Sequence, residues 1–316
     1  MTMEFLLDQT HDDLADTVTA LTERAGGTAV ARAWSDGDRG PALAVYRQLA
    51  QGGITGLLVP EELGGSGAGP VEMMVAVEAL GRSALPGPVV ETCAVVPHLL
   101  AVAGNGDELA PLLAGDTLGT VAAPPRQPRA ADTEGAAVYL LDGRTLSRGV
   151  PSDVQSTVDP ARTVAAVTAG PALVDGIDVA AVTDLAALAT AAYTLGLGST
   201  MLSVAADYAR ARNQFGKPIG SFQAVKHHLA DVAIALEMAR PLVWGAALTL
   251  DRSDCSAAKV ATADAADLAA RRALQVLGAI GYTAEHDLAL YLTRARALRS
   301  AWGTPAVHRA AILETL

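Results

Sequence analysis

The sequence is poor in aromatic residues and in cysteine. It has three Phe, three Trp, six Tyr and two Cys in 316 residues, although 51% of the chain is hydrophobic. A hydrophobic composition carried largely by alanine favours close-packed helices over an aromatic-rich β-sandwich. Cys93 and Cys255 lie far apart, and the acidic N-terminus lacks the basic flank and apolar core of a signal peptide. The sequence therefore predicts an α-rich protein of the reducing cytoplasm.

Positive charge is also scarce. The chain has 23 Lys and Arg against 34 Asp and Glu, a formal net charge of -11. This balance argues against long-range attraction to nucleic acid or to an anionic membrane, although a local basic patch can still bind a phosphate. Gly, Pro or charged residues interrupt the apolar stretches before they reach the roughly 20 residues that span a bilayer. We expect neither a nucleic-acid partner nor a transmembrane segment.

Hydrophobic periodicity divides the chain into three predicted regions. Apolar residues recur three and four positions apart within residues 12–23 and 41–51, as they do on one face of a helix. We expect an N-terminal helical domain at 1–117, a reduced β domain at 118–179 and a C-terminal helical bundle at 180–316. The expected fold class is mainly α with a small β module.

Two glycine-containing segments near the N-terminus are expected to be loops. WSDGDRG, residues 34–40, separates the first two predicted helices, and PEELGGSG, residues 60–67, precedes a predicted helix at 71–81. The second segment has no long strand before it and no Lys-Ser/Thr after it, as a Walker-type phosphate loop requires. A turn is the better prediction.

The β domain is predicted from the short runs GTVAA, AVYLL, TVAAV and ALV, which turn-forming residues separate. Strands that are few and short form a sheet that is only marginally stable alone, so this sheet must pack on helices.

The C-terminal region carries the strongest helical pattern. One apolar stripe with spacings of four and three consists of Val225, Leu229, Val232, Leu236, Ala239 and Val243. A further helix predicted at 256–277 is rich in alanine and leucine on two sides, so we expect it at the centre of a bundle or against another subunit.

Two motifs in this region resemble those of the acyl-CoA dehydrogenase family. RARNQFGKPIGSFQAVKHHLAD, residues 210–231, is similar to the family signature with Arg-x-x-Phe-Gly, Pro-Ile, Phe-Gln, Lys-His and Leu-Ala-Asp. LQVLGAIGYTAEHDLALYLTRARALRSAWGTPAVHR, residues 274–309, resembles the family's Gln-x-x-Gly-Gly-x-Gly-Tyr run and its closing Gly-Thr. Residues 53–82 resemble the family more weakly. The resemblance implies an N-terminal helical domain, a middle β domain, a C-terminal four-helix bundle and FAD bound across a subunit interface.

The resemblance also implies which residues of this chain bind FAD. They are Arg212, Gln214, Phe215, Gln275, Gly278 and Thr304. In the family, these motifs hold the pyrophosphate and adenosine of FAD that a neighbouring subunit carries. A guanidinium offers forked, permanently charged donors to phosphate oxygens, and a glycine lets the backbone approach a ligand closely. Ala279 stands where the family commonly has a second glycine.

The catalytic base of the family is missing from both positions where it is known. The usual glutamate directly precedes the closing Gly-Thr, and this chain has Trp302 there. The alternative position corresponds to about Ala186, and Asp184, two residues away, would point about 200° from it on a helix. PPRQPRAADTEGAA, residues 124–137, stands where the family has a loop that holds the flavin ring.

Together these features resemble the small subunits of the α2β2 steroid side-chain acyl-CoA dehydrogenases of actinobacteria. The expected partner is then a larger subunit that carries the catalytic glutamate, with an acyl-CoA substrate, FAD as cofactor and electron-transfer flavoprotein as acceptor. Two alternatives remain open. The chain could be an autonomous flavoenzyme with an unrecognised base, for which Asp184 and Glu285 are candidates, or a cofactor-free scaffold of the same fold.

Neither a metal site nor a cysteine nucleophile is expected. His227 and His228 are adjacent on a predicted helix, so their side chains point about 100° apart, and no second ligand lies three or four positions away. Cys255 has no His nearby in the sequence, which favours a buried thiol.

Overall fold

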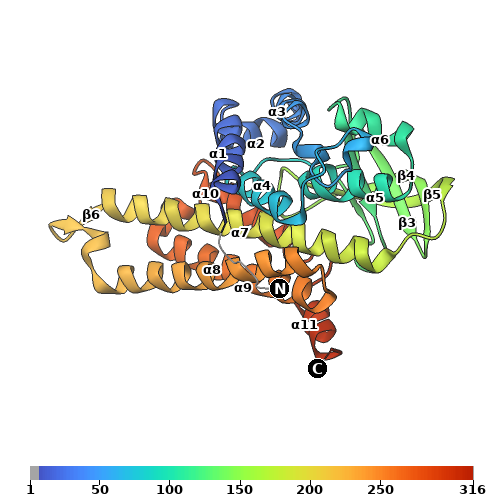
Figure 1. Cartoon of the computed structure of the whole chain (residues 1–316). Coiled ribbons are helices and arrows are strands. Elements are labelled where there is room, and N and C mark those ends of the chain that lie inside the picture. The colour runs from blue at the N-terminus through green and yellow to red at the C-terminus, as the bar shows by residue number, and fades with distance from the viewer. Residues whose placement is uncertain (1–6, 316) are drawn as a thin grey trace.

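The computed structural model describes residues 7–315 and shows an N-terminal group of helices, a sheet and a C-terminal bundle (Figure 1). The N-terminal helices are α1 (Gln9–Arg24), α2 (Thr28–Ser35), α3 (Gly40–Gln51), α4 (Pro70–Arg82), α5 (Val96–Val102) and α6 (Gly106–Leu113). The helices predicted at 12–23, 41–51 and 71–81 are thus α1, α3 and α4. Three helices were not predicted, and α2 takes up the start of the segment expected to be a loop at 34–40.

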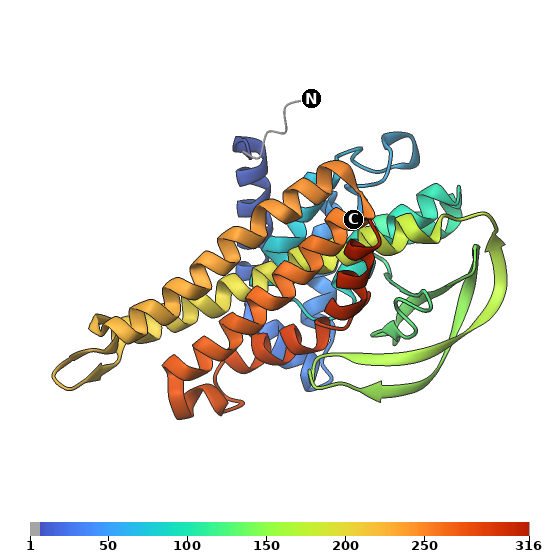
Figure 2. The same cartoon turned by 90° about the horizontal axis from the view of Figure 1, so that it is seen from below.

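The sheet contains strands longer than the sequence indicated. Its strands are β1 (Leu118–Ala122), β2 (Ala130–Ala131), β3 (Ala136–Asp142), β4 (Thr145–Ser156) and β5 (Thr163–Val174), in the order β1-β3-β4-β5-β2. The pair β1 and β3 is parallel, and the other pairs are antiparallel. The expectation of short strands was wrong, because TVAAV and ALV belong to one strand and β4 had no signal. Figure 2 shows β4 and β5 as a long curved ribbon beside the helices.

The C-terminal bundle is built around one long helix. Its helices are α7 (Val179–Ala211), α8 (Gln223–Thr249), α9 (Arg252–Leu277), α10 (Leu288–Leu298) and α11 (Pro305–Leu313). In Figure 1, α7 runs between the N-terminal helices and the pair α8 and α9. Every residue from Val182 to Gly198 is buried. This architecture confirms the predicted fold class, mainly α with a small sheet, whereas the division into three domains stays a prediction.

The helices α4 and α7 cross through glycine. A Cβ atom on Gly81 would lie 2.1 Å from the carbonyl oxygen of Tyr193, and one on Gly196 would lie 2.1 Å from the carbonyl oxygen of Glu78. No side chain fits at either position, so the two backbones are in direct contact. This contact fixes the N-terminal helices on the bundle.

Two helices contain longer apolar stretches than the sequence analysis expected. By length and composition alone, α7 and α8 could each cross a membrane, because each holds an 18-residue window of mean hydropathy 1.4 or 1.3. The window in α7 is 83% buried inside the protein, and that in α8 is 39% buried. The buried core helix of a soluble protein meets the same criteria of length and hydropathy, and α7 is buried in this way.

Candidate functional site

Trp302 lies in the turn between α10 and α11 and is fully buried. Its backbone is left-handed, with φ 56°, which is unfavourable for a bulky side chain. Gly303 follows with φ 103°, and a Cβ there would lie 2.7 Å from Nε2 of His308. The turn therefore requires glycine after the tryptophan and must be held by its surroundings.

Three hydrogen bonds hold Trp302. The indole Nε1 donates to Oε1 of Glu91 at 3.0 Å, and the backbone N–H donates to Oε1 of Gln127 at 2.9 Å. The carbonyl oxygen lies 3.0 Å from Nε2 of His308. These partners come from the N-terminal region, the loop after β1 and α11, so the turn joins all three parts of the fold.

The contacts of His308 determine its tautomer. A carbonyl oxygen can only accept, so Nε2 carries the proton and donates to Trp302, which leaves Nδ1 to accept from the hydroxyl of Ser256 at 3.0 Å. Burial lowers the pKa of His308 to about 4. The ring is therefore neutral at physiological pH and acts as a fixed bridge between α11 and α9.

The space beside the indole is almost completely filled. A cavity lined by Glu91, Tyr193, Arg294 and Trp302, among others, has a volume of about 10 Å³. That is at the lower limit for a single water molecule. Glu91 was not identified in the sequence, and the available signal was a lone carboxylate in the apolar run of residues 86–96.

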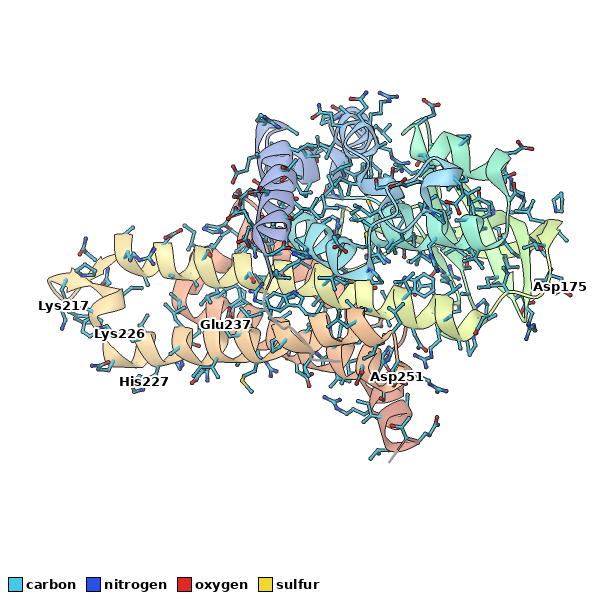
Figure 3. The ribbon with its side chains drawn as sticks, viewed as in Figure 1. Asp175, Lys217, Lys226, His227, Glu237 and Asp251 are labelled. Atoms are coloured by element: carbon cyan, nitrogen blue, oxygen red, sulfur yellow. The ribbon has the colours of Figure 1, made fainter. Side chains whose placement is uncertain are left out.

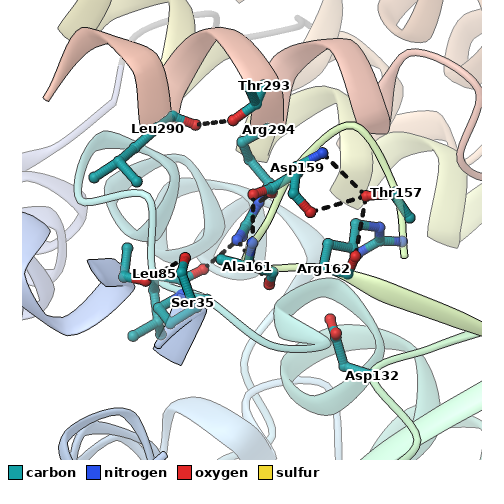
Figure 4. Close-up of polar contacts among 12 residues, drawn as sticks. Ser35, Leu85, Asp132, Thr157, Asp159, Ala161, Arg162, Leu290, Thr293 and Arg294 are labelled. Atoms are coloured by element: carbon teal, nitrogen blue, oxygen red, sulfur yellow. Dashed lines mark hydrogen bonds and ion pairs between the residues drawn. The ribbon is translucent and has the colours of Figure 1, made fainter. Parts of the chain in front are cut away.

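Arg294, which lines this cavity, belongs to a buried ion pair (Figure 4). The guanidinium of Arg294 in α10 pairs with Asp159, in the loop between β4 and β5, and donates to the carbonyl oxygen of Leu85 at 2.9 Å. The carboxylate of Asp159 also accepts from the backbone N–H of Ala161 at 2.9 Å. The pair fixes this loop against α10. The loop ends with Arg162, which is thereby held in place.

A larger groove lies on the other side of Arg162. It has a volume of about 680 Å³ and lies between the loop after β1, the loop between β4 and β5, α10 and the start of α11. Its charged lining residues are Arg126, Arg129, Arg162 and Arg296, with no Asp or Glu. We call it the arginine groove.

Three of the residues predicted to bind FAD lie on a hairpin between α7 and α8. Strands β6 (Asn213–Gln214) and β7 (Lys217–Pro218) form this hairpin, which projects at the end of α7 remote from the large sheet (Figure 1). Figure 3 places Lys217 and Lys226 at this end and Asp175 at the opposite one. The side chain of Arg212 has no hydrogen bond or ion pair within residues 7–315, and Phe215 is 91% exposed.

The other three predicted residues lie elsewhere. Gln275 is exposed near the end of α9, and Gly278 caps that helix with a left-handed φ of 61°. Thr304 caps the start of α11 and is the member of the predicted set that lines the arginine groove. The structure therefore does not bring the six residues into one site within a single chain.

Comparison with known proteins decides the family. Models described as acyl-CoA dehydrogenase N-terminal domain and C-terminal domain match residues 8–108 and 175–316. Acyl-CoA dehydrogenase IpdE2 of Mycobacterium tuberculosis is 33% identical over 289 residues, which cover 89% of each chain. The chain belongs to the acyl-CoA dehydrogenase family. Membership implies oxidoreductase chemistry with FAD as cofactor.

Solved structures show the same fold. A chain of the ChsE4-ChsE5 complex from Mycobacterium tuberculosis superimposes with a TM-score of 0.85 at 24% identity, covering 99% of this chain and 98% of that one. A steroid acyl-CoA dehydrogenase named Tcur3481-Tcur3483, in a G363A variant, also gives 0.85 at 22% identity, with 97% of both chains covered. The acyl-CoA dehydrogenase fold implied by the motifs is confirmed.

The exposed residues of the hairpin have the chemistry to contact a dinucleotide cofactor. Arg212 offers a guanidinium without a partner among the described residues, and Gln214 and Phe215 are exposed beside it. An exposed aromatic ring next to free cationic donors suits the phosphates and flat rings of a dinucleotide. No residue of the hairpin lines the arginine groove, and Arg162 of the groove lies beside Tyr193 in the middle of α7, whereas the hairpin follows the end of that helix.

Neither alternative base faces a substrate space. Asp184 is buried in α7 and lines neither the arginine groove nor the small cavity, and burial raises its pKa. Glu285 is exposed in the segment before α10. Cys255 is buried, and burial raises the pKa of its thiol to about 12, which makes it a poor nucleophile.

Proposed function

We propose that this chain is the base-lacking subunit of a heteromeric FAD-dependent acyl-CoA dehydrogenase. The observation that carries the proposal is Trp302, which stands at the position of the family's glutamate and is buried and hydrogen-bonded on every polar atom. The reaction is the α,β-desaturation of an acyl-CoA thioester, and the base belongs to a larger partner subunit.

Trp302 cannot replace the base. An indole N–H is a donor only, and this one already donates to Glu91. A general base must lie within hydrogen-bond reach of the proton that it removes. The cavity of about 10 Å³ beside the indole leaves no room for an acyl group. Glu91 lines the same cavity, so it is as inaccessible to a substrate as the indole.

The chain contributes cofactor contacts instead. Arg212 would bind a phosphate of FAD with its free guanidinium, Gln214 would add a polar contact, and Phe215 would pack on a flat face of the ligand. Gln275, Gly278 and Thr304 complete the proposed set. FAD, when bound, supplies the hydride acceptor for the β-carbon.

The relatives support a steroid-derived acyl group as the substrate class. One structural neighbour, which covers 97% of this chain, is named a steroid acyl-CoA dehydrogenase. Another neighbour comes from a complex of two different proteins, which supports a heteromeric assembly. Electron-transfer flavoprotein is the proposed electron acceptor.

Expression with and without the partner tests the proposal. We expect the chain alone to purify colourless or in poor yield, and the complex with a glutamate-containing homologue from a neighbouring gene to absorb near 450 nm. Replacing the partner's glutamate should abolish acyl-CoA-dependent flavin reduction while leaving the bound flavin spectrum nearly intact. A stable yellow homo-oligomer of this chain with activity of its own would refute the assignment.

A further inference from the structure

One face of α8 is apolar and exposed along most of the helix. The opposite face packs on α9, α7 and α4. The apolar residues of the exposed face recur at intervals of three or four, which keeps them on one side of a helix. The most exposed of them are Ile234, at 63%, and Met238, at 69%. We call the set the apolar strip, and it consists of Ala230, Ile234, Met238, Pro241, Leu242, Gly245 and Leu248.

A strip of this kind is typical of a protein contact surface. It extends over about 27 Å of α8, since a helix rises about 1.5 Å per residue. Contiguous apolar surface of this extent is rare on monomeric proteins and marks interaction sites. The charged residues beside it already have partners, because Asp231 pairs with Arg272 at 3.4 Å and Glu237 with Arg240 at 3.5 Å. The strip therefore offers apolar contact without an unpaired charge among its own residues.

The end of α8 next to the hairpin is basic. Figure 3 shows Lys217, Lys226 and His227 together at this end, Glu237 further along the helix, and Asp251 beyond its other end. The side chain of Lys226 is exposed and makes no hydrogen bond or ion pair within residues 7–315. Its ammonium group is therefore available to a carboxylate of another molecule.

The other end of α8 borders an acidic groove. Asp8 and Glu72 line this groove together with Trp244 and Leu248, and its volume is about 460 Å³. The lining residues include no Lys or Arg. Nδ1 of His11 lies 2.7 Å from Asp8, and its Nε2 lies 3.5 Å from Glu72, so two carboxylates share one imidazole. The groove thus has carboxylate charge in excess of cationic charge.

The strip is complementary to itself when two α8 helices run antiparallel. With Met238 facing Met238, Ile234 of one copy faces Leu242 of the other, because both lie four residues from the centre. The basic end of each copy then reaches the acidic end of the other. Lys226 and Trp244 are separated by about five whole turns, so they lie on the same flank of α8. A two-fold axis across the pair keeps that flank, and Lys226 meets the acidic groove of the second copy.

We propose that the apolar strip binds a second copy of this chain, with the two α8 helices antiparallel about a two-fold axis at Met238. The charges select this arrangement, since a parallel pair would place the two basic ends side by side. A two-fold contact in which the same patch meets itself is the commonest kind in oligomers. The inference goes beyond the proposed function, because it requires neither flavin nor the partner's base.

A single introduced cysteine tests the contact and its direction. Cys93 and Cys255 are both buried, so the introduced thiol is the accessible one. We expect a short bis-maleimide to cross-link two copies of Met238→Cys, because the axis places this position next to its counterpart. Ala230→Cys is the matched control on the same strip. Its two copies lie about 24 Å apart in the antiparallel pair, so they should not be cross-linked. Cross-linking at Ala230→Cys, or none between copies at Met238→Cys, would overturn the proposal.

The mass of the assembly tests whether the strip holds it together. Light scattering should find two copies of this chain in the wild-type particle and one in Ile234→Lys, which halves the mass. Val102→Lys should keep two copies, since Val102 is 60% exposed but lies at the end of α5. The measurement applies to the chain alone or with its larger subunit, so it can fail while the proposed function holds. Two copies in Ile234→Lys, or loss of the larger subunit from that variant, would show that the strip does not bind a second copy.

Discussion

Placing a carboxylate at Trp302 tests whether this chain holds a latent active site. The substitution Trp302→Glu restores a glutamate at the position of the family's base. The new carboxyl group lies in a buried space next to Glu91, whose Oε1 is 3.0 Å from the indole nitrogen in the wild type. Burial and a nearby carboxylate both disfavour ionisation, so the pKa of the introduced carboxyl is raised. The indole is lost as well, and only about 10 Å³ of free space surrounds it.

The loss of the buried indole determines the expected change in the free energy of unfolding. Truncating a buried large aromatic side chain costs about 3–5 kcal/mol, because contacts are lost and a cavity remains. We therefore expect Trp302→Glu to be destabilised by about 3–5 kcal/mol at neutral pH. The introduced carboxyl has its pKa raised in the folded state, so its unfavourable contribution is absent below its unfolded pKa of about 4.3 and grows as the pH rises.

Urea denaturation between pH 4 and 8 measures this dependence, with Trp302→Phe as the control. The phenylalanine variant keeps a ring but leaves Oε1 of Glu91 without its donor, so it should lose about 1–3 kcal/mol. In the complex whose partner lacks its glutamate, Trp302→Glu should show no acyl-CoA-dependent flavin reduction. Recovery of reduction, or wild-type stability of Trp302→Glu at pH 7.5, would contradict the proposal that this chain holds no active site of its own.

The remaining predictions concern the hairpin, the ion pair and a buried lysine. Arg212→Ala should weaken FAD retention in the complex by about 10- to 150-fold on dialysis, while Arg210→Ala, which loses only an exposed pair with a neighbouring aspartate, should retain flavin. Arg294→Met leaves Asp159 buried and unpaired, so denaturation should show a loss of about 3–5 kcal/mol; an unchanged midpoint would refute this. Lys259 is fully buried, and burial lowers its pKa from 10.5 to about 7. Between these values the unfolded chain binds more protons, so the stability of the wild type relative to Lys259→Met should rise with pH from about 7 to 10.5. Denaturation series across that range that run parallel for the two proteins would show that the lysine keeps its ordinary pKa.

The sequence predicted those elements whose local pattern agrees with their burial. The apolar spacing of α8 is an example, because Val232, Leu236, Ala239 and Val243 are all buried. Strand β4 was not predicted, because Gly149, Pro151 and polar residues interrupt the alternation of apolar and polar positions, and most of its second half is exposed. It is a strand because it pairs with β3 and β5, a long-range cause that local pattern does not report.

Some residues of the candidate site could likewise be identified from the sequence, and others could not. A motif located Trp302, since its neighbours Gly303 and Thr304 are part of the family's closing segment. The partner of the indole, Glu91, is 211 residues away, and no periodicity links such a pair. The FAD contacts assigned to the hairpin stay predictions.

The separation of the hairpin from the arginine groove has a genetic consequence. Arg162 of the groove shares the small cavity with Tyr193 of α7, and α7 runs on from there to Ala211, which corresponds to about 27 Å. In the proposed heteromer, a substitution in the hairpin would leave this chain folded and its groove intact, and the loss of FAD would occur in the partner subunit. A screen for loss of the partner's cofactor should therefore return alleles here, clustered around Arg212.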